Sequence, residues 1–140
     1  MRNTLTTMGT AAGAFLLVMG TASTAAAADY WEECALVDVR GQGWFDNWTA
    51  SRVDISLQVQ DTKADGHHVA IRFISMDKRT NKYKSWPWRH NYDGAGTSKY
   101  WDTYASDSNG RLNSIGIQAA VMEGSEVISN CLKMVPGSRP

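Results

Sequence analysis

The segment Arg52–Gln60, RVDISLQVQ, alternates strictly between apolar and polar side chains. Its apolar residues, Val53, Ile55, Leu57 and Val59, occupy every second position, which is the period of a β-strand with one buried and one exposed face. In a helix the same residues would be scattered around the axis. The pattern therefore predicts a strand over 52–60.

The chain after this segment predicts a partner strand. Asp65-Gly66 is a turn dipeptide, and Val69–Ile74 is rich in β-branched residues. Folding the chain about Ala64 sets three apolar pairs on one face, as a β-hairpin requires. The expected pairs are Val59 with Val69, Leu57 with Ile71, and Ile55 with Phe73.

Turn signals recur along the rest of the chain, and no segment carries a sustained helical stripe. Turns are expected at Asp93–Gly96, at Asp107–Gly110, whose Asn-Gly is a strong hairpin signal, and at Glu123–Glu126. Further strands are expected at Cys34–Arg40, Lys99–Tyr104, Leu112–Met122 and Val127–Val135. The last has an ambiguous alternation, because Val127 and Cys131 favour one face and Ile128 and Leu132 the other. We predict an all-β domain of about six to eight antiparallel strands, folded as a β-sandwich or, alternatively, a flattened β-barrel.

The N-terminus has the three parts of a secretory signal: Arg2, an uncharged apolar stretch around Phe15–Val18, and the small residues Ala25–Ala28. A membrane anchor would need about 20 strongly apolar residues, whereas Gly, Thr and Ser dilute this stretch. We expect residues 1–28 to be a signal peptide, residues 29–140 to form one domain, and the protein to be secreted and extracellular.

Two cysteines in an exported chain favour one disulfide, Cys34 to Cys131, between the first and last strands. Closing a loop of nearly a hundred residues is expected to stabilise the fold by about 4 to 5 kcal/mol. The alternative is two free buried thiols.

Charge excludes some partners. Fourteen basic residues balance fourteen acidic ones, and no run of like charge is present. Nucleic acid and anionic membranes select clustered positive charge, so neither is expected as a partner. No cofactor motif is present, and the oligomeric state is left open.

The stretch Ser85–Gly96, SWPWRHNYDGAG, is the candidate binding segment. Pro87 cannot donate to a sheet ladder, which places the segment on an edge strand or a loop. On an extended backbone Trp86 and Trp88 point the same way, about 6.6 Å apart, and would form a flat platform for a polysaccharide or the cleft of a secreted hydrolase. The predicted ligand-binding residues are Trp86, Trp88, Arg89 and Tyr92. The alternative is that these tryptophans cap the open end of the sandwich.

A second aromatic cluster lies in Gly41–Thr49, GQGWFDNWT. Its two glycines favour an irregular loop, which either joins the first patch or forms a hydrophobic plug under the sheets. Neighbouring His67 and His68 point to opposite faces of a strand and cannot easily serve one ion. We therefore predict no metal site and expect Asp61 to bond its own turn backbone.

No motif of a hydrolase is present, and nothing selects a carboxylate pair such as Asp102 with Glu123 for glycoside hydrolysis. The sequence favours a non-catalytic binding protein. The alternatives are a small secreted hydrolase, or a structural or surface-associated protein whose aromatic residues are core.

Two resemblances add to this interpretation. The stretch Val59–Phe73, VQDTKADGHHVAIRF, resembles a segment of small exported proteins of actinobacteria, a group without an established activity, which implies bacterial export and a β fold. Trp88-Arg89-His90 is similar to the Trp-Arg-Tyr triplet of the small secreted α-amylase inhibitors. Those carry two disulfides where this chain has at most one, so the similarity implies only a mechanism, an aromatic and arginine protrusion entering a partner's cleft.

Overall fold

The computed structural model describes residues 29–136; the expected signal peptide lies outside them. These residues form nine β-strands and no helix. The strands are β1 (Tyr30–Ala35), β2 (Val39–Asp46), β3 (Arg52–Asp61), β4 (His68–Asp77), β5 (Tyr83–Ser85), β6 (Arg89–Asn91), β7 (Ser98–Ser106), β8 (Leu112–Glu123) and β9 (Glu126–Met134).

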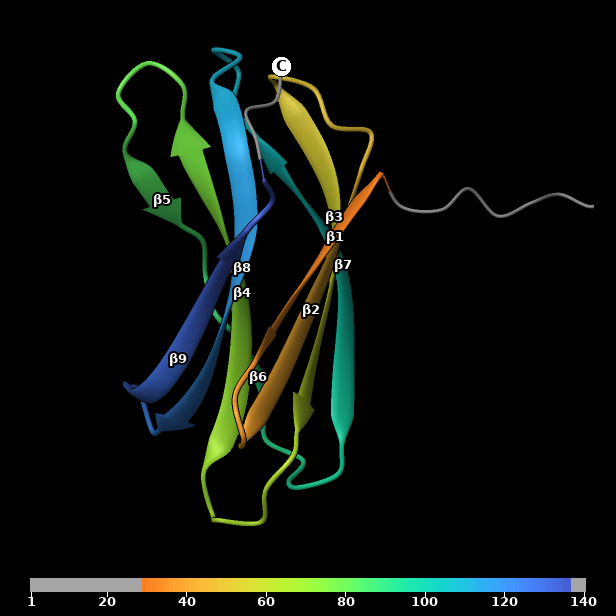
Figure 1. Ribbon diagram of the computed structural model, residues 1–140, viewed down its shortest axis with the longest axis vertical. Coiled ribbons are helices and arrows are strands. Elements are labelled where there is room, and N and C mark those ends of the chain that lie inside the picture. Colours follow the sequence, from red (N-terminus) through yellow and green to blue (C-terminus); the bar gives the residue numbers. More distant parts are fainter. Residues whose placement is uncertain (1–28, 137–140) are drawn as a thin grey trace, which may run out of the picture.

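Two antiparallel sheets face each other as the layers of a sandwich (Figure 1). Sheet A has the order β1-β2-β3-β7, and sheet B has the order β5-β4-β8-β9. The short strand β6 also pairs with β4, so that β5 and β6 share one edge of that strand. The sheets do not close on each other. The predicted all-β sandwich is confirmed, and the barrel alternative is wrong.

The core lies between the sheets, and the alternating segment supplies its centre. Val53, Ile55, Leu57 and Val59 of β3 are all 2% exposed or less, as the period-two pattern predicts. Phe45 of β2 packs with them, and sheet B contributes the inward side chains of β4 and β8. The predicted strands at 99–104 and 112–122 are confirmed as parts of β7 and β8.

The predicted hairpin between 52–60 and 69–74 is wrong. β3 pairs with β2 and β7, whereas β4 pairs with β5, β6 and β8. The intervening residues 62–67 carry the chain from one layer to the other, at the lower end of Figure 1. The apolar faces do meet, but across the core and not along a ladder. Period two fixes which face is buried and leaves the strand partner undetermined.

Residues 34–49 also differ from the prediction. The expected strand at 34–40 contains a turn, because β1 ends at Ala35 and β2 begins at Val39. The expected loop at 41–49 is mostly strand β2. Its glycines face the core, where a Cβ on Gly41 would lie 2.6 Å from Ala119 Cβ and one on Gly43 2.5 Å from Ile117 Cγ2. The glycines therefore allow close approach of the two sheets.

The strands β8 and β9 form a hairpin, turned at Gly124, which has a φ of 57°. The Asn-Gly turn after β7 instead crosses from sheet A to sheet B. The ambiguous alternation of the last strand has a structural cause. A register shift pairs Val121 with Ser129 and Met122 with Val127, which leaves Ile128 without a partner residue on β8.

The predicted disulfide is confirmed. Cys34 of β1 is bonded to Cys131 of β9, with 5.8 Å between their Cα atoms. The bond joins an edge strand of sheet A to an edge strand of sheet B. Neither described cysteine is free. In the described part of the chain, no helix has the length and apolarity to cross a membrane.

Candidate functional site

The structure separates the two tryptophans of the predicted platform. Trp86 packs against the main core and lies on Phe73, with 4.7 Å between the ring centroids. Its indole N–H donates to Ser75 Oγ over 3.0 Å, and the Lys84 ammonium lies 3.9 Å from its ring. One ring face is therefore covered by protein, and Lys84 shields the indole further.

Trp88 lies on the opposite, outer face of sheet B. There it covers Ala70, Ala120 and Met122, while the Arg72 guanidinium sits 4.2 Å from its ring. The expected side-by-side platform is wrong, because Pro87 lies in a break between β5 and β6 where the backbone is not a continuous strand. The alternative, tryptophans that cap the open end of the sandwich, does not describe Trp88, which covers the outer face of sheet B.

The remaining two predicted residues also point apart. Arg89 reaches across to sheet A, where its Nη2 donates to Thr103 Oγ1 over 2.9 Å. Tyr92 is 66% exposed and contacts the rings of His68 and His90. The structure does not bring Trp86, Trp88, Arg89 and Tyr92 into one surface, and their role in binding stays a prediction.

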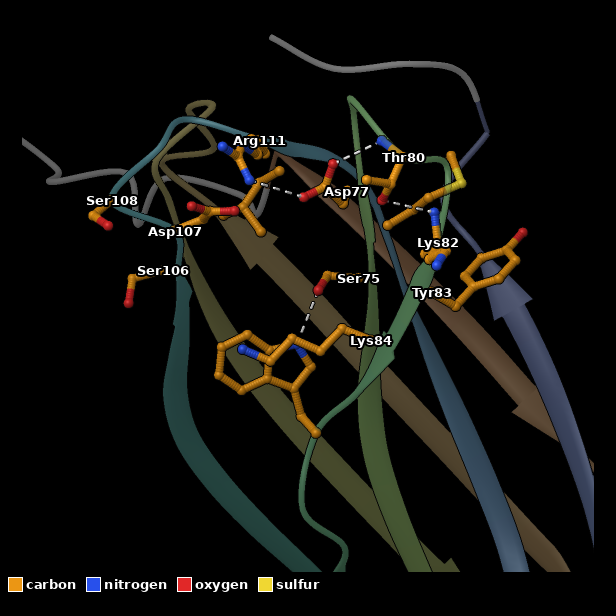
Figure 2. Close-up of a pocket in the computed structure, with 13 residues that line it drawn as sticks. Ser75, Asp77, Thr80, Lys82, Tyr83, Lys84, Ser106, Asp107, Ser108 and Arg111 are labelled. Atoms are coloured by element: carbon orange, nitrogen blue, oxygen red, sulfur yellow. Dashed lines mark hydrogen bonds and ion pairs between the residues drawn. The ribbon is translucent and has the colours of Figure 1, made fainter.

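A cavity of about 440 Å³ lies beside Trp86, between the β4–β5 turn and the β7–β8 turn (Figure 2). Its charged groups are largely engaged. Asp77 accepts backbone N–H bonds from Arg79 and Thr80 and lies 3.8 Å from Arg111. These hydrogen bonds, from Thr80 first, lower the pKa of Asp77 below its ordinary value. The rim of the pocket is mostly polar, with Tyr83 as its one exposed aromatic side chain.

A larger group of aromatic side chains lies on the outer face of sheet A. We call this surface the aromatic face; its members are Trp31 of β1, Trp44 of β2, and Tyr100 and Tyr104 of β7. Trp31 is 58% exposed, Tyr100 56% and Tyr104 50%, while Trp44 is half-buried among them. Trp44 and Tyr100 lie 6.3 Å apart between ring centroids.

The strand register arranges the aromatic face in rows across the sheet. One row runs Trp31, Trp44, Ser56, Asp102, and the next runs Glu33, Gln42, Gln58, Tyr100. Residues in a row come from adjacent strands, about 4.8 Å apart, and consecutive rows are two residues apart along each strand, about 6.6 Å. Aromatic rings therefore stand at both sides of the sheet, with hydroxyl, amide and carboxylate groups between them.

Hydrogen bonds hold these polar groups in place. Glu33 accepts from Arg40 Nε over 2.8 Å and from Gln42 Nε2 over 2.7 Å, and the bond from Arg40 is the main cause that lowers the pKa of Glu33. Ser56 Oγ donates to Asp102 Oδ1 over 2.7 Å. The face is thus a preorganised surface of fixed donors and acceptors.

The aromatic face carries an excess of negative charge. Among the outward residues of its strands, four carboxylates stand against two guanidinium groups, an excess of two negative charges. The carboxylates are Glu33, Asp46, Asp54 and Asp102, and the guanidinium groups are Arg40 and Arg52. Hydrogen bonds from Asn47 and then Arg52 lower the pKa of Asp54, which keeps it ionised at neutral pH. A polyanion would be repelled here.

Sequence reasoning missed the aromatic face, although part of the signal was present. In β7 the outward Tyr100 and Tyr104 alternate with the half-buried Trp101 and the buried Ala105. Trp31 and Trp44 are opposite each other only because β1 and β2 pair in one register, which a single strand does not reveal. The imagined carboxylate pair is also separated, since Asp102 lies on sheet A and Glu123 at the end of β8 on sheet B.

A comparison with known proteins identifies no family: no family model matches the chain, and no curated protein or solved structure is significantly similar to it.

Proposed function

We propose that this protein is a secreted, non-catalytic binding protein that holds a neutral polysaccharide on the aromatic face. The observation that carries the proposal is a contiguous group of aromatic side chains on the outer face of sheet A, in which Trp31 and Tyr100 are exposed and Trp44 is half-buried. Contiguous exposed apolar surface rimmed by polar groups marks contact sites. Aromatic rings supply large contact area at low conformational cost.

The chemistry of the polar groups supports a carbohydrate ligand. Sugar rings present apolar C–H faces and a rim of hydroxyl groups. Gln42 and Gln58 lie in the row between Glu33 and Tyr100, where their amides can donate to and accept from hydroxyls. Sheet A has four strands, so the face is about 14 Å across, which suits a short stretch of an extended chain.

The charge of the face supports a neutral polymer. Its two excess negative charges oppose uronic acid or phosphate polymers and leave neutral glycans favoured. The earlier alternative, an inhibitor that inserts Trp88 and Arg89 into a hydrolase cleft, finds less support, because Trp88 packs on Ala70 and Ala120 and Arg89 bonds Thr103.

Retention on polysaccharides tests the proposal. The purified protein is to be run in native gels containing soluble neutral glycans, and sedimented with insoluble ones such as cellulose and chitin, with polygalacturonate as the anionic comparison. We expect retention by at least one neutral glycan and none by the polyanion. Trp44→Ala and Tyr100→Ala should each weaken binding at least about tenfold, the equivalent of about 1.4 kcal/mol.

Tyr92→Ala is the matched control, because Tyr92 is more exposed than Tyr100 but lies beside β6 on sheet B. It should bind like the parent protein. The aromatic face would be rejected as the site if the parent protein were retained by no neutral glycan. It would also be rejected if Tyr92→Ala and Tyr100→Ala lost the same amount of glycan affinity. Turnover of the glycan during these assays would favour a hydrolase instead.

A further inference from the structure

The outer face of sheet B brings together two histidines that are far apart in sequence. β6 pairs with β4 so that His90 is opposite Ala70, and His68 lies two residues from Ala70 on the same face. Diagonal neighbours of this kind are within reach of long side chains. Here His68 Nε2 lies 3.1 Å from His90 Nδ1.

We propose that His68 and His90 form a binding site for one divalent transition-metal ion. Zinc–imidazole bonds are about 2.0 to 2.1 Å long, so two nitrogens bound to one ion at angles of 90° to 110° are about 2.9 to 3.4 Å apart. The separation of 3.1 Å falls inside this interval. Neutral imidazole is also the ligand that zinc, nickel and copper accept most readily in proteins.

Binding of the ion needs no added base to remove the proton that His68 and His90 share. In the metal-free protein one of the two facing nitrogens carries a proton and donates it to the other. On binding, both facing nitrogens give their lone pairs to the ion. The shared proton leaves its nitrogen, and the same ring takes one up at its other nitrogen, so that each histidine remains a neutral imidazole with one N–H.

Neighbouring side chains orient the pair, and a cavity adjoins its His68 side. The Tyr92 ring lies 4.4 Å from the His68 ring and stacks on His90 at 5.3 Å with an angle of 12° between their planes. Burial, and then the charge of His90, lower the pKa of His68 below its ordinary value, and the Glu123 carboxylate opposes this to a smaller extent. A cavity of about 530 Å³ lies on the His68 side of the pair and is lined by His68 and Tyr92 but not by His90.

The site supplies two protein ligands. Within residues 29–136, no three histidine, cysteine or acidic side chains are grouped closely enough to hold an ion. Both cysteines are in the disulfide. Water must fill the remaining positions, so affinity should follow the usual order for imidazole sites, with Cu²⁺ above Ni²⁺ and Zn²⁺, and no binding of Mg²⁺.

Calorimetric titration of the purified protein with Cu²⁺, Ni²⁺, Zn²⁺ and Mg²⁺ tests the proposal. We expect one equivalent of Cu²⁺ that depends on both histidines, with His68→Asn and His90→Asn each weakening it at least about tenfold. The matched control is His67→Asn, because His67 is the third histidine of the chain and bonds Glu123 over 2.6 Å instead of joining the pair. It should change affinity less than about twofold.

A second readout separates loss of ligand from loss of fold. Cu²⁺ should raise the melting temperature of the parent and of His67→Asn, but not of His90→Asn, even if that variant melts lower at the start. The paramagnetic resonance spectrum of bound Cu²⁺ should show two equatorial nitrogens. Equal effects of His67→Asn and His90→Asn, or parent binding no tighter than that of His90→Asn, would overturn the proposal. The glycan tests do not depend on this result.

Discussion

The outer faces of the two sheets use tryptophan in opposite ways. On sheet A, Trp31 and Trp44 stand opposite each other and contact solvent. On sheet B, Trp88 lies flat over Ala70 and Ala120, with Arg72 against its ring. Both faces belong to the same sandwich.

The difference lies in what each sheet presents to its tryptophans. The outer positions of β4 and β8 include alanines, which leave space for an indole delivered by the segment between β5 and β6. The outer positions of β2 and β3 carry Gln42, Ser56 and Gln58, and no described segment crosses them. Exposed aromatic surface therefore arises where the neighbouring rows are polar. Tryptophan content alone does not mark a binding site.

Removing the disulfide should have the largest effect, because both faces depend on one core. Cys34 and Cys131 close a separation of 97 residues, and the loop-entropy estimate for such a loop is about 4.7 kcal/mol. We expect Cys34→Ala/Cys131→Ala to lose about 4 kcal/mol in urea unfolding. A loss below about 1 kcal/mol would show that the core holds the sheets together without the bond.

Trp88→Ala tests whether the tryptophan on the outer face of sheet B serves packing. It uncovers Ala70, Ala120 and Met122 and removes the contact with Arg72. Because Trp88 is only partly buried, the expected loss of unfolding free energy is about 3 kcal/mol, at the lower end of the range for Trp→Ala. Glycan retention in native gels should be unchanged. Loss of retention at full stability would assign binding to sheet B.

Gly43→Ala tests the close approach of the sheets beneath the aromatic face. The added Cβ would overlap Ile117 Cγ2 at 2.5 Å, and overpacking costs about 1 to 3 kcal/mol. We expect a loss of about 2 kcal/mol by urea unfolding. Glycan affinity should fall only if the outward side chains of β2 in the aromatic face, Gln42 and Trp44, shift together with the strand. Unchanged stability would contradict tight packing there.

Acid should weaken the fold through the carboxylates of the aromatic face. The pKa of Glu33 lies below its ordinary value of 4.5, mainly because Arg40 donates to it. A group with a depressed folded pKa contributes stability that is present above its unfolded pKa and is lost as pH falls through the folded value. Stability should therefore decline below pH 4.5, and Glu33→Gln should decline less steeply. The effect is small because Arg40 is exposed and Glu33 is only half-buried, so that solvent screens the pair.

Trp31→Ala should have the smallest effect on stability and so sharpens the contrast with Trp88. A side chain 58% exposed on an edge strand contributes little to the core, and the expected change is within about 0.5 kcal/mol. Neutral glycan retention should nevertheless fall. A large destabilisation, comparable to that of Trp88→Ala, would mean that Trp31 serves packing and not contact.

Part of the fold was predictable from local pattern. The alternation of apolar and polar residues predicted the buried face of β3, and the turn at Glu123–Glu126 was predicted from its sequence. The presence of only two cysteines predicted the disulfide. The pairing of β3 with β7 was not predictable, because Val59 and Val69 are equally compatible with a ladder and with packing across a core. The candidate sites were missed because each one joins strands distant in sequence: Trp44 with Tyr100, and His68 with His90.

The sequence by itself determined that the chain is all-β, which face of β3 is buried, and that Cys34 is bonded to Cys131. These properties depend on local backbone periodicity or on there being only two cysteines. The tertiary structure alone decided which aromatic side chains reach solvent and which histidines meet. Those outcomes depend on the pairing and packing of strands far apart in the chain, and side-chain identity along one strand does not encode what lies beside it.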